Sequence, residues 1–197
     1  MKRLDENIER REPIRVRRPT APGEPATLVD VFTRVVRDHN RADALNYKSD
    51  GRWVPISSDE MLAQANNIAA GWHAIGIRRG DRVALLSESR VEWTLTDAGC
   101  IFGGVIDVPI YPTLTPPQVR YILNDSGASA LVIEGREKFD ELKDILGECP
   151  EIKQIVYFDP AGMTSAEGLS LKELEDLGRE FQQQNPRLLD DVAHDIT

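Results

Sequence analysis

The residues best placed to bind a ligand lie where a short apolar run gives way to the expected start of a helix. Ser87-Glu88-Ser89 follows the apolar residues 83–86 and precedes a helical pattern. Ligands of α/β sheets bind at such junctions, and a helix N-terminus attracts anions. Glu88 and Glu92 would repel an anion, however, and Ser89 is expected to cap the helix. We therefore favour a structural role for this segment over a phosphate-binding one.

Other residue types that carry catalysis occur without the partners that catalysis needs. His39, His73 and His194 are far apart in the sequence, and none has an acidic or cysteine neighbour at metal-ligand spacing. The sequence has no Gly-x-x-x-x-Gly-Lys-Ser/Thr run, no Gly-x-Gly-x-x-Gly fingerprint and no Gly-x-Ser-x-Gly motif. We therefore assign no catalytic, cofactor-binding or metal-binding residue to this chain.

The stretch between residues 100 and 117 is rich in structural signals. Gly103-Gly104 precedes an apolar strand, so it is expected to end a helix rather than to hold a ligand. Asp107 interrupts that strand, and we favour a structural role for its carboxylate. Tyr111-Pro112-Thr113 could face a ligand, but a rigid turn that packs on a neighbouring domain is favoured. The tryptophans fit core or interface positions: Trp53, Trp72 and Trp93.

The elements that would position these residues alternate regularly from residue 82 onward. Short apolar strands are predicted at 83–86, 105–110, 130–133 and 154–158, with amphipathic helices between them. The strands are nearly free of alternation, which indicates burial on both faces. We predict an α/β fold with a parallel sheet flanked by helices, in the order β-α-β-α-β-α-β.

A helix and a short hairpin are predicted before this region. The helix begins after Thr27, with Leu28, Val31, Phe32 and Val35 on one face. The hairpin joins strands 44–48 and 52–56 through Asp50-Gly51, a strong turn signal. Four helices are expected to begin with a capping box, in which a Ser or Thr and a Glu or Gln three residues later satisfy each other's backbone N–H groups. The four pairs are Ser57 and Glu60, Ser89 and Glu92, Thr115 and Gln118, and Ser170 and Glu173.

The charge of the chain is acidic overall but basic at its N-terminus. The net charge is −9, which argues against a nucleic-acid partner. Residues 1–18 carry seven Lys or Arg and four Asp or Glu, about +3, so the remainder is near −12. We expect a basic extended arm over 1–26, an α/β subdomain over 27–184 and a linker over 185–197 leading to an absent phosphate-loop region. The arm is expected to be solvated; weak contact with an anionic membrane is the alternative.

Cysteine content and hydropathy set the expected compartment. Cys100 and Cys149 sit in no Cys-x-x-Cys motif, and Cys100 is expected to be a buried free thiol. No apolar run approaches the roughly 18 residues of a membrane span, and the N-terminus lacks the apolar core of a secretory signal. A cytoplasmic protein, with peripheral membrane contact as the alternative, is expected.

Three segments resemble the N-terminal region of long-chain acyl-CoA synthetases, which belong to the adenylate-forming (AMP-binding) superfamily. They are WVPISSDEML (53–62), GIRRGDRVALLSESRVEW (76–93) and CIFGGVIDVPIYPTLTPPQVRYILNDSGASALV (100–132). The first resembles the family's opening core motif, and the third resembles its second. Their order and spacing extend the resemblance over about residues 27–190.

The resemblance implies an ATP-dependent long-chain fatty acid–CoA ligase, for which Mg-ATP, CoA and a fatty acid would be the ligands of the full-length enzyme. The family's phosphate loop, metal ligand and adenylation lysine have no counterpart in these residues. We therefore expect an incomplete N-terminal subdomain that binds the missing remainder of the enzyme and is inactive alone. The alternatives are a stand-alone partner-binding or dimerisation module, including a homodimer, and a flavodoxin-like small-ligand binder.

Overall fold

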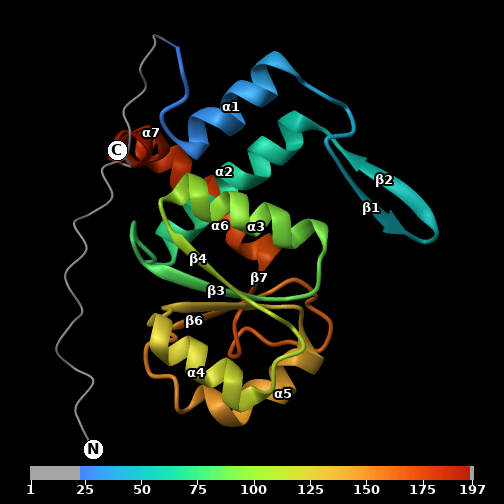
Figure 1. Cartoon of the computed structure of the whole chain (residues 1–197), viewed down its shortest axis with the longest axis vertical. Helices are drawn as coiled ribbons and strands as arrows, with labels where there is room; N and C mark the ends of the chain where they lie inside the picture. Colours follow the sequence, from blue (N-terminus) through green and yellow to red (C-terminus); the bar gives the residue numbers. More distant parts are fainter. Residues whose placement is uncertain (1–22, 196–197) are drawn as a thin grey trace, which may run out of the picture.

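The computed structural model describes residues 23–195 of the chain, with side chains through Ala193. It contains a two-stranded antiparallel hairpin and a five-stranded sheet whose neighbouring strands are all parallel. Helices cover both faces of the larger sheet (Figure 1). The predicted fold class is therefore confirmed, including the hairpin. The basic arm lies outside the described residues up to residue 22.

The helices and strands fall close to the predicted ranges. The strands are β1 Leu45–Ser49, β2 Arg52–Ile56, β3 Arg82–Leu86, β4 Ile106–Ile110, β5 Ala130–Ile133, β6 Gln154–Tyr157 and β7 Leu169–Ser170. The helices are α1 Leu28–Asp38, α2 Ser58–Ala74, α3 Val91–Gly103, α4 Pro116–Ser126, α5 Arg136–Leu146, α6 Leu171–Gln184 and α7 Leu188–Asp195. Among these elements, β7 and α7 were not predicted.

The strands of the larger sheet lie in the order β4-β3-β5-β6-β7. β3 therefore lies between β4 and β5, although the chain forms β4 before β5. The chain moves outward from β3 in one direction and then returns to build the other half of the sheet. This reversal is the doubly wound arrangement, and it leaves a crevice at the carboxyl ends of β3 and β5.

Alternate residues of β3 belong to two different hydrophobic clusters. Val83 and Leu85 pack with α2, α3 and α6 on one face of the sheet. Ala84 and Leu86 pack with α4 and α5 on the other face. All four residues of β5 are buried in the same way. Burial on both faces, predicted from the lack of alternation, is thus confirmed for the two central strands, and Figure 1 shows the two helix layers above and below them.

The same prediction is wrong for β4, which lies at the edge of the sheet. Ile106 is 48% exposed, and only Ile110 of this strand is fully buried. The Ile106 N–H donates to Asp81 O at 2.9 Å on the β3 side. Backbone groups of alternate residues point to opposite sides of a strand, so Pro109 lies on the free side, where its missing N–H disrupts no ladder.

An outer layer of two helices covers the seam between α2 and α3. Val29 and Phe32 of α1 and Leu189 of α7 pack on a cluster formed by Ala65, Ala69, Ala98 and Phe102. The apolar face predicted for α1 is therefore partly wrong. Leu28, Val31 and Val35 are 60%, 41% and 49% exposed, so they do not face the core. The apolar arc of α1 is wider than the seam, so the inward positions are Val29, Phe32 and Val36.

α7 lies within the stretch that was expected to be a linker. Leu188, Leu189 and Val192 supply its apolar residues, and Val192 is 8% exposed. A short helix can form here because tertiary packing against α3 compensates for its low intrinsic stability. The prediction that this stretch leads to a phosphate loop is not tested by the structure.

Three of the four predicted capping boxes are present. The Ser57 N–H donates to Glu60 Oε2 at 2.8 Å, and the Ser170 N–H donates to Glu173 Oε2 at 2.7 Å. The Thr115 N–H donates to Gln118 Oε1 at 3.0 Å. The box at Ser89 and Glu92 is wrong, because α3 begins one residue later, with Arg90 as its N-cap. The Arg90 guanidinium binds Glu92 instead, so this carboxylate is unavailable for capping.

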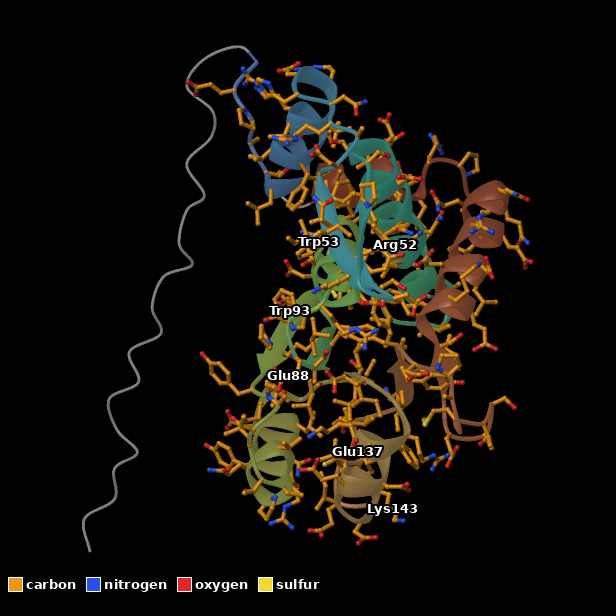
Figure 2. All side chains as sticks on the ribbon, turned by 90° about the vertical axis from the view of Figure 1, so that its right-hand side faces the viewer. Arg52, Trp53, Glu88, Trp93, Glu137 and Lys143 are labelled. Atoms are coloured by element: carbon orange, nitrogen blue, oxygen red, sulfur yellow. The ribbon has the colours of Figure 1, made fainter. Side chains whose placement is uncertain are left out.

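The predicted hairpin is also present. Asp50 and Gly51 both have positive φ angles, 49° and 78°, as a two-residue hairpin turn of the I′ type requires. The hairpin projects from the domain beside α2, and Figure 2 shows Arg52 and Trp53 on it. Trp53 is 70% exposed, so of the two positions predicted for it, core or interface, it does not take the core one, and the interface position stays a prediction. No helix in the described part of the chain has the length and hydropathy of a membrane span.

Glycines allow α2 and α6 to approach closely. A Cβ atom at Gly178 would lie 1.9 Å from Asn67 O, and one at Gly71 would lie 2.4 Å from Leu174 O. Backbone atoms cannot yield to such contacts as a flexible side chain can. These two positions therefore fix the distance between α2 and α6, two of the three helices that cover one face of the sheet.

We predict that Gly178→Ala destabilises the fold by about 1–3 kcal/mol, since an added methyl group would force the two helices apart. Gly147→Ala is the matched control, because Gly147 has helical dihedral angles and its Cβ would meet nothing within 4 Å. Urea unfolding of both variants measures the difference. Equal stabilities for the two variants would contradict the role given to the close helix contact.

Candidate functional site

The candidate site is the crevice at the carboxyl ends of the parallel strands. The loops after β3, β4, β5 and β6 meet there, because parallel strands place their carboxyl ends at one edge of the sheet. The crevice has a cavity of about 470 Å³, lined by Glu88, Arg90, Glu134, Arg136, Lys138 and Asp159 among others. A neighbouring cavity of about 570 Å³ lies beside Trp93 and Tyr111.

The carboxylate of Glu134 is among the groups that line the crevice. Its Oε1 accepts a hydrogen bond from the Glu88 backbone N–H at 2.9 Å and lies 3.2 Å from Ser87 Oγ. Ser87 is buried and directly follows β3, whereas Glu134 directly follows β5. The carboxylate therefore joins the loops that follow the two strands on either side of the switch point.

Gly135 permits this arrangement. A Cβ atom at Gly135 would lie 2.9 Å from Asp159 O, so the loops after β5 and β6 are in direct backbone contact. The Asp159 N–H donates to Glu134 O at 2.7 Å. Three consecutive loops are thereby fixed relative to one another by backbone atoms and one carboxylate.

The arginine nearest the start of α3 is paired with a carboxylate. Arg90 Nε and Nη2 donate to the two oxygens of Glu92 at 2.7 and 2.9 Å, and its guanidinium lies 5.2 Å from the centre of the Phe158 ring. Partial burial acts to raise the pKa of Glu92, but the hydrogen bonds and charge of Arg90 outweigh burial and lower this pKa. The same hydrogen bond raises the pKa of Arg90.

The other cations of the crevice are paired as well. Arg136 Nη2 lies 2.6 Å from both Glu167 Oε2 and Gly162 O. Lys138 Nζ lies 2.6 Å from Glu141 Oε2 and donates to Pro112 O at 3.3 Å. Arg90, Arg136 and Lys138 therefore each contact a carboxylate. A phosphate would have to displace these partners as well as Glu134.

The predicted structural role of Ser87-Glu88-Ser89 agrees with this geometry, although the capping part of that prediction is wrong. Ser87 and Glu88 bind Glu134, and Glu88 and Ser89 are exposed. Figure 2 shows Glu88 below Trp93 on one side of the molecule. Tyr111, at the end of β4, is 78% exposed and lines the same cavity as Trp93. The sequence could not reveal Glu134 as the partner, since it lies 47 residues from Ser87.

The histidines are not brought together. His39 caps the end of α1, whereas His73 is buried with its Nε2 3.0 Å from Gly103 O. The side chain of His194 lies outside the described part of the chain. Within residues 23–193, no group of three or more His, Cys, Asp or Glu side chains could hold a metal ion. His73 therefore has a structural role that ties α2 to the end of α3.

The remaining sequence features have structural roles. Gly104 ends α3 in the left-handed conformation with φ 66°, which agrees with the prediction for Gly103-Gly104. Trp72 is fully buried, as expected of a core tryptophan. Cys100 and Cys149 are buried free thiols, and burial raises the pKa of both.

Asp107 has a partner that the sequence analysis missed. Burial, followed by the charge of Asp107 and a hydrogen bond with it, raises the pKa of Asp97 to about 6. Asp97 lies on α3 and Asp107 on β4, so the two carboxyl groups meet across the Gly103-Gly104 turn. The available signal was the occurrence of two aspartates in apolar segments on either side of a tight turn. The negative charge of Asp107 therefore favours the protonated form of Asp97.

Comparisons with known proteins place this architecture among adenylate-forming enzymes. Residues 32–194 match the family described as AMP-binding enzyme. The chain is 27% identical over 161 residues to the long-chain-fatty-acid–CoA ligase ACSBG1 of Rattus norvegicus, covering 81% of this chain and 22% of that protein. It is 29% identical over 145 residues to the long-chain-fatty-acid–CoA ligase FadD15 of Mycobacterium bovis, covering 72% of this chain and 24% of that protein.

A solved structure supports the same fold. The adenylation domain of a carboxylate reductase from Mycobacterium chelonae superposes with a TM-score of 0.68 at 22% identity, covering 82% of this chain and 30% of that one. Agreement at this identity concerns the fold alone. The chain spans about a quarter of the length of the curated relatives described above.

We predict that Glu134→Gln lowers the free energy of unfolding by about 1.5–3 kcal/mol, the range for a hydrogen bond to a charged group. Glu137→Gln, an exposed residue of the same crevice, is the control and should change stability by less than about 1 kcal/mol. Chemical denaturation measures both. A Glu134→Gln variant as stable as the wild type would show that this carboxylate does not hold the loops.

A second prediction concerns pH. The folded-state pKa of Asp97 is raised to about 6. Between about pH 4 and 6 the folded chain therefore binds more protons at Asp97 than the unfolded chain does. The free energy of unfolding consequently falls as pH rises through this range. Asp97→Asn removes the titrating group and with it this fall in the free energy of unfolding. The stability of Asp97→Asn relative to wild type should therefore increase by about 1–2 kcal/mol between pH 4.5 and 7.5, after allowance for solvent screening.

The comparison with wild type at each pH cancels the opposite effect of carboxylates with lowered pKa values, such as Glu60 and Glu173. Urea unfolding across this pH range provides the measurement. A stability difference that stays constant with pH would rule out the raised pKa of Asp97.

Proposed function

The chain belongs to the AMP-binding enzyme family, and on that premise we propose that it forms the N-terminal α/β subdomain of an ATP-dependent long-chain fatty acid–CoA ligase. The family match over residues 32–194 is the observation that carries this proposal. The two relatives described above are both long-chain-fatty-acid–CoA ligases, which favours the long-chain branch.

The proposed reaction of the full-length enzyme has two steps. A fatty acid carboxylate attacks the α-phosphate of Mg-ATP, and pyrophosphate leaves as the acyl-adenylate forms. The thiol of CoA then attacks the acyl carbon and AMP leaves. Both steps develop negative charge on phosphate oxygens, so they need preorganised donors and cations around the phosphates.

A bound nucleotide phosphate would have to compete with contacts that the residues lining the crevice already make. Glu134 accepts the Glu88 backbone N–H in the crevice, and Arg90, Arg136 and Lys138 each contact a carboxylate of the chain itself. This arrangement engages groups that a phosphate would otherwise bind. The proposed role of this region is therefore to position other parts of the ligase, and no reaction step is assigned to its residues.

A partner-binding or dimerisation module is the second candidate. The exposed apolar residues of α1 favour it, because Leu28, Val31 and Val35 share one outward flank of the helix. The reading frame beyond codon 197 discriminates between the two functions. A Ser/Thr/Gly-rich run ending in Pro-Lys-Gly soon after Thr197 supports the ligase, whereas a natural stop codon supports the module.

We predict that the purified 197-residue chain does not catalyse fatty-acid-dependent exchange of pyrophosphate into ATP. The physical reason is that its crevice offers no uncommitted cation for the transferred phosphates. A complete long-chain fatty acid–CoA ligase assayed in parallel is the positive control. Exchange above background by the chain alone, abolished by heat, would overturn the proposed division of roles.

A further inference from the structure

The free edge of β1 borders a groove beside the start of α3. The cavity has a volume of about 540 Å³. One wall is formed by residues 45–48 of the hairpin, and the other by residues 89–92 and Thr94. None of the described residues of β2 lines this cavity. The groove therefore lies on the side of β1 that faces away from its partner strand.

The register of the hairpin leaves backbone groups of β1 without partners. Ser49 and Arg52 flank the two-residue turn at Asp50-Gly51, and a pair in this position exchanges both of its hydrogen bonds. Asn46 and Lys48 therefore lie at the alternate positions, where the N–H and C=O groups point away from β2. Among the described strands β1 pairs with β2 alone, so the outward backbone groups of Asn46 and Lys48 have no strand partner.

The outer edge of β2 is protected against further pairing, whereas that of β1 is not. Pro55 lies opposite Asn46 on the outward side of β2, where it has no N–H to offer to another strand. β1 contains no proline. The hairpin is half-buried at Leu45, Val54 and Ile56 and exposed elsewhere, and an isolated two-stranded ribbon is only marginally stable in water. A third strand on the edge of β1 would therefore stabilise the hairpin.

The charges that line the groove favour an acidic partner. Arg90 and Glu92 both line it but bind each other, so their charges largely cancel. Lys48 also lines the groove, and within residues 23–193 it has no ion-pair partner. An edge lysine disfavours pairing with a basic strand, whereas a carboxylate directly opposite it on a neighbouring strand stabilises the pair.

The two faces of β1 indicate which sequence fits beside it. Successive side chains of a strand point to opposite faces, so Leu45 and Tyr47 share one face and Asn46 and Lys48 share the other. An added strand meets apolar side chains on the first face and the Lys48 ammonium on the second. A segment in which apolar and acidic residues alternate matches both. β1 has five residues, and a segment of the same length extends about 17 Å.

We propose that the groove between β1 and α3 binds an extended segment of a partner protein in which acidic and apolar residues alternate. The segment adds to the hairpin as a third strand, through the backbone groups of Asn46 and Lys48. Its acidic side chains lie beside Lys48, and its apolar side chains pack on Leu45 and Tyr47. Backbone hydrogen bonds supply the affinity of such strand addition, and the alternating side chains supply the specificity. This binding is independent of the proposed ligase reaction.

A designed peptide tests the proposal. The probe is acetyl-Glu-Val-Glu-Val-Glu-amide, which is titrated into the isotopically labelled 197-residue chain. The amide resonances of Asn46 and Lys48 should shift saturably. Lys48→Glu should weaken binding about fivefold or more, because it replaces an attraction across the strands by a repulsion. Lys153→Glu makes the same charge change at an exposed position outside the groove and should leave the affinity unchanged.

Methylated peptides separate strand pairing from charge attraction alone. The N–H groups of alternate residues of a strand face a given neighbour. Methylation of the backbone nitrogens at the glutamates, or in a second peptide at the valines, therefore removes the paired donors from only one of the two peptides. That peptide should lose about tenfold or more in affinity, since it loses at least two hydrogen bonds, and the other should bind like the parent.

The absence of a saturable shift at Asn46 and Lys48 would overturn the proposal, as would an equal effect of the two methylation patterns. Binding of acetyl-Lys-Val-Lys-Val-Lys-amide with the same affinity would contradict the selection of an acidic segment. If dilution of the chain alone shifted the two resonances, the edge of β1 would be assigned to a second copy of the chain instead. If anionic vesicles shifted them and the peptide did not, it would be assigned to a lipid surface.

Discussion

Burial of β3 and β5 on both faces is the constraint on which the rest of the structure depends. Alternate residues of these strands enter two separate hydrophobic clusters, so each face of the sheet requires its own layer of helices. Parallel neighbours and crossover helices follow from that requirement, because a parallel connection must pass over a face of the sheet. Close contact between α2 and α6 at Gly71 and Gly178 then sets the depth of one layer. The loops are left at the two ends of the sheet, and the carboxyl end becomes the crevice.

The crevice has the position of a ligand site but is satisfied by residues of the chain. Glu134 binds the backbone of Glu88 across the switch point, and ion pairs of Arg90 with Glu92 and of Arg136 with Glu167 hold the surrounding loops. Donors and cations that already have partners stabilise a fold, whereas a phosphate-transfer site needs them available for the transition state. Under the proposed function, this position in the fold serves as a scaffold.

Local signals in the sequence predicted local structure well, and contacts between distant residues account for what it missed. The capping pairs at Ser57 and Ser170 and the Asp50-Gly51 turn depend on neighbours within three residues, so their types suffice. At Ser89 the same pattern failed because Arg90 competes for the Glu92 carboxylate. Which strand lies at the edge, which flank of α1 faces inward and which partner Asp107 meets depend on the order of strands and the seam between helices. Those are tertiary properties, and amphipathic patterns alone do not determine them.

The central claim is that Glu134 engages the Glu88 backbone N–H of the crevice, so that the crevice does not accept a nucleotide phosphate. An NMR titration of the isotopically labelled chain with pyrophosphate and with ATP tests it most directly, through the amide resonances of Ser87, Glu88 and Gly135. The account predicts that these resonances stay within the small, unsaturable shifts caused by added salt. A saturable shift of the Glu88 amide, with an accompanying rise in melting temperature, would show that a phosphate displaces Glu134 and would contradict the account.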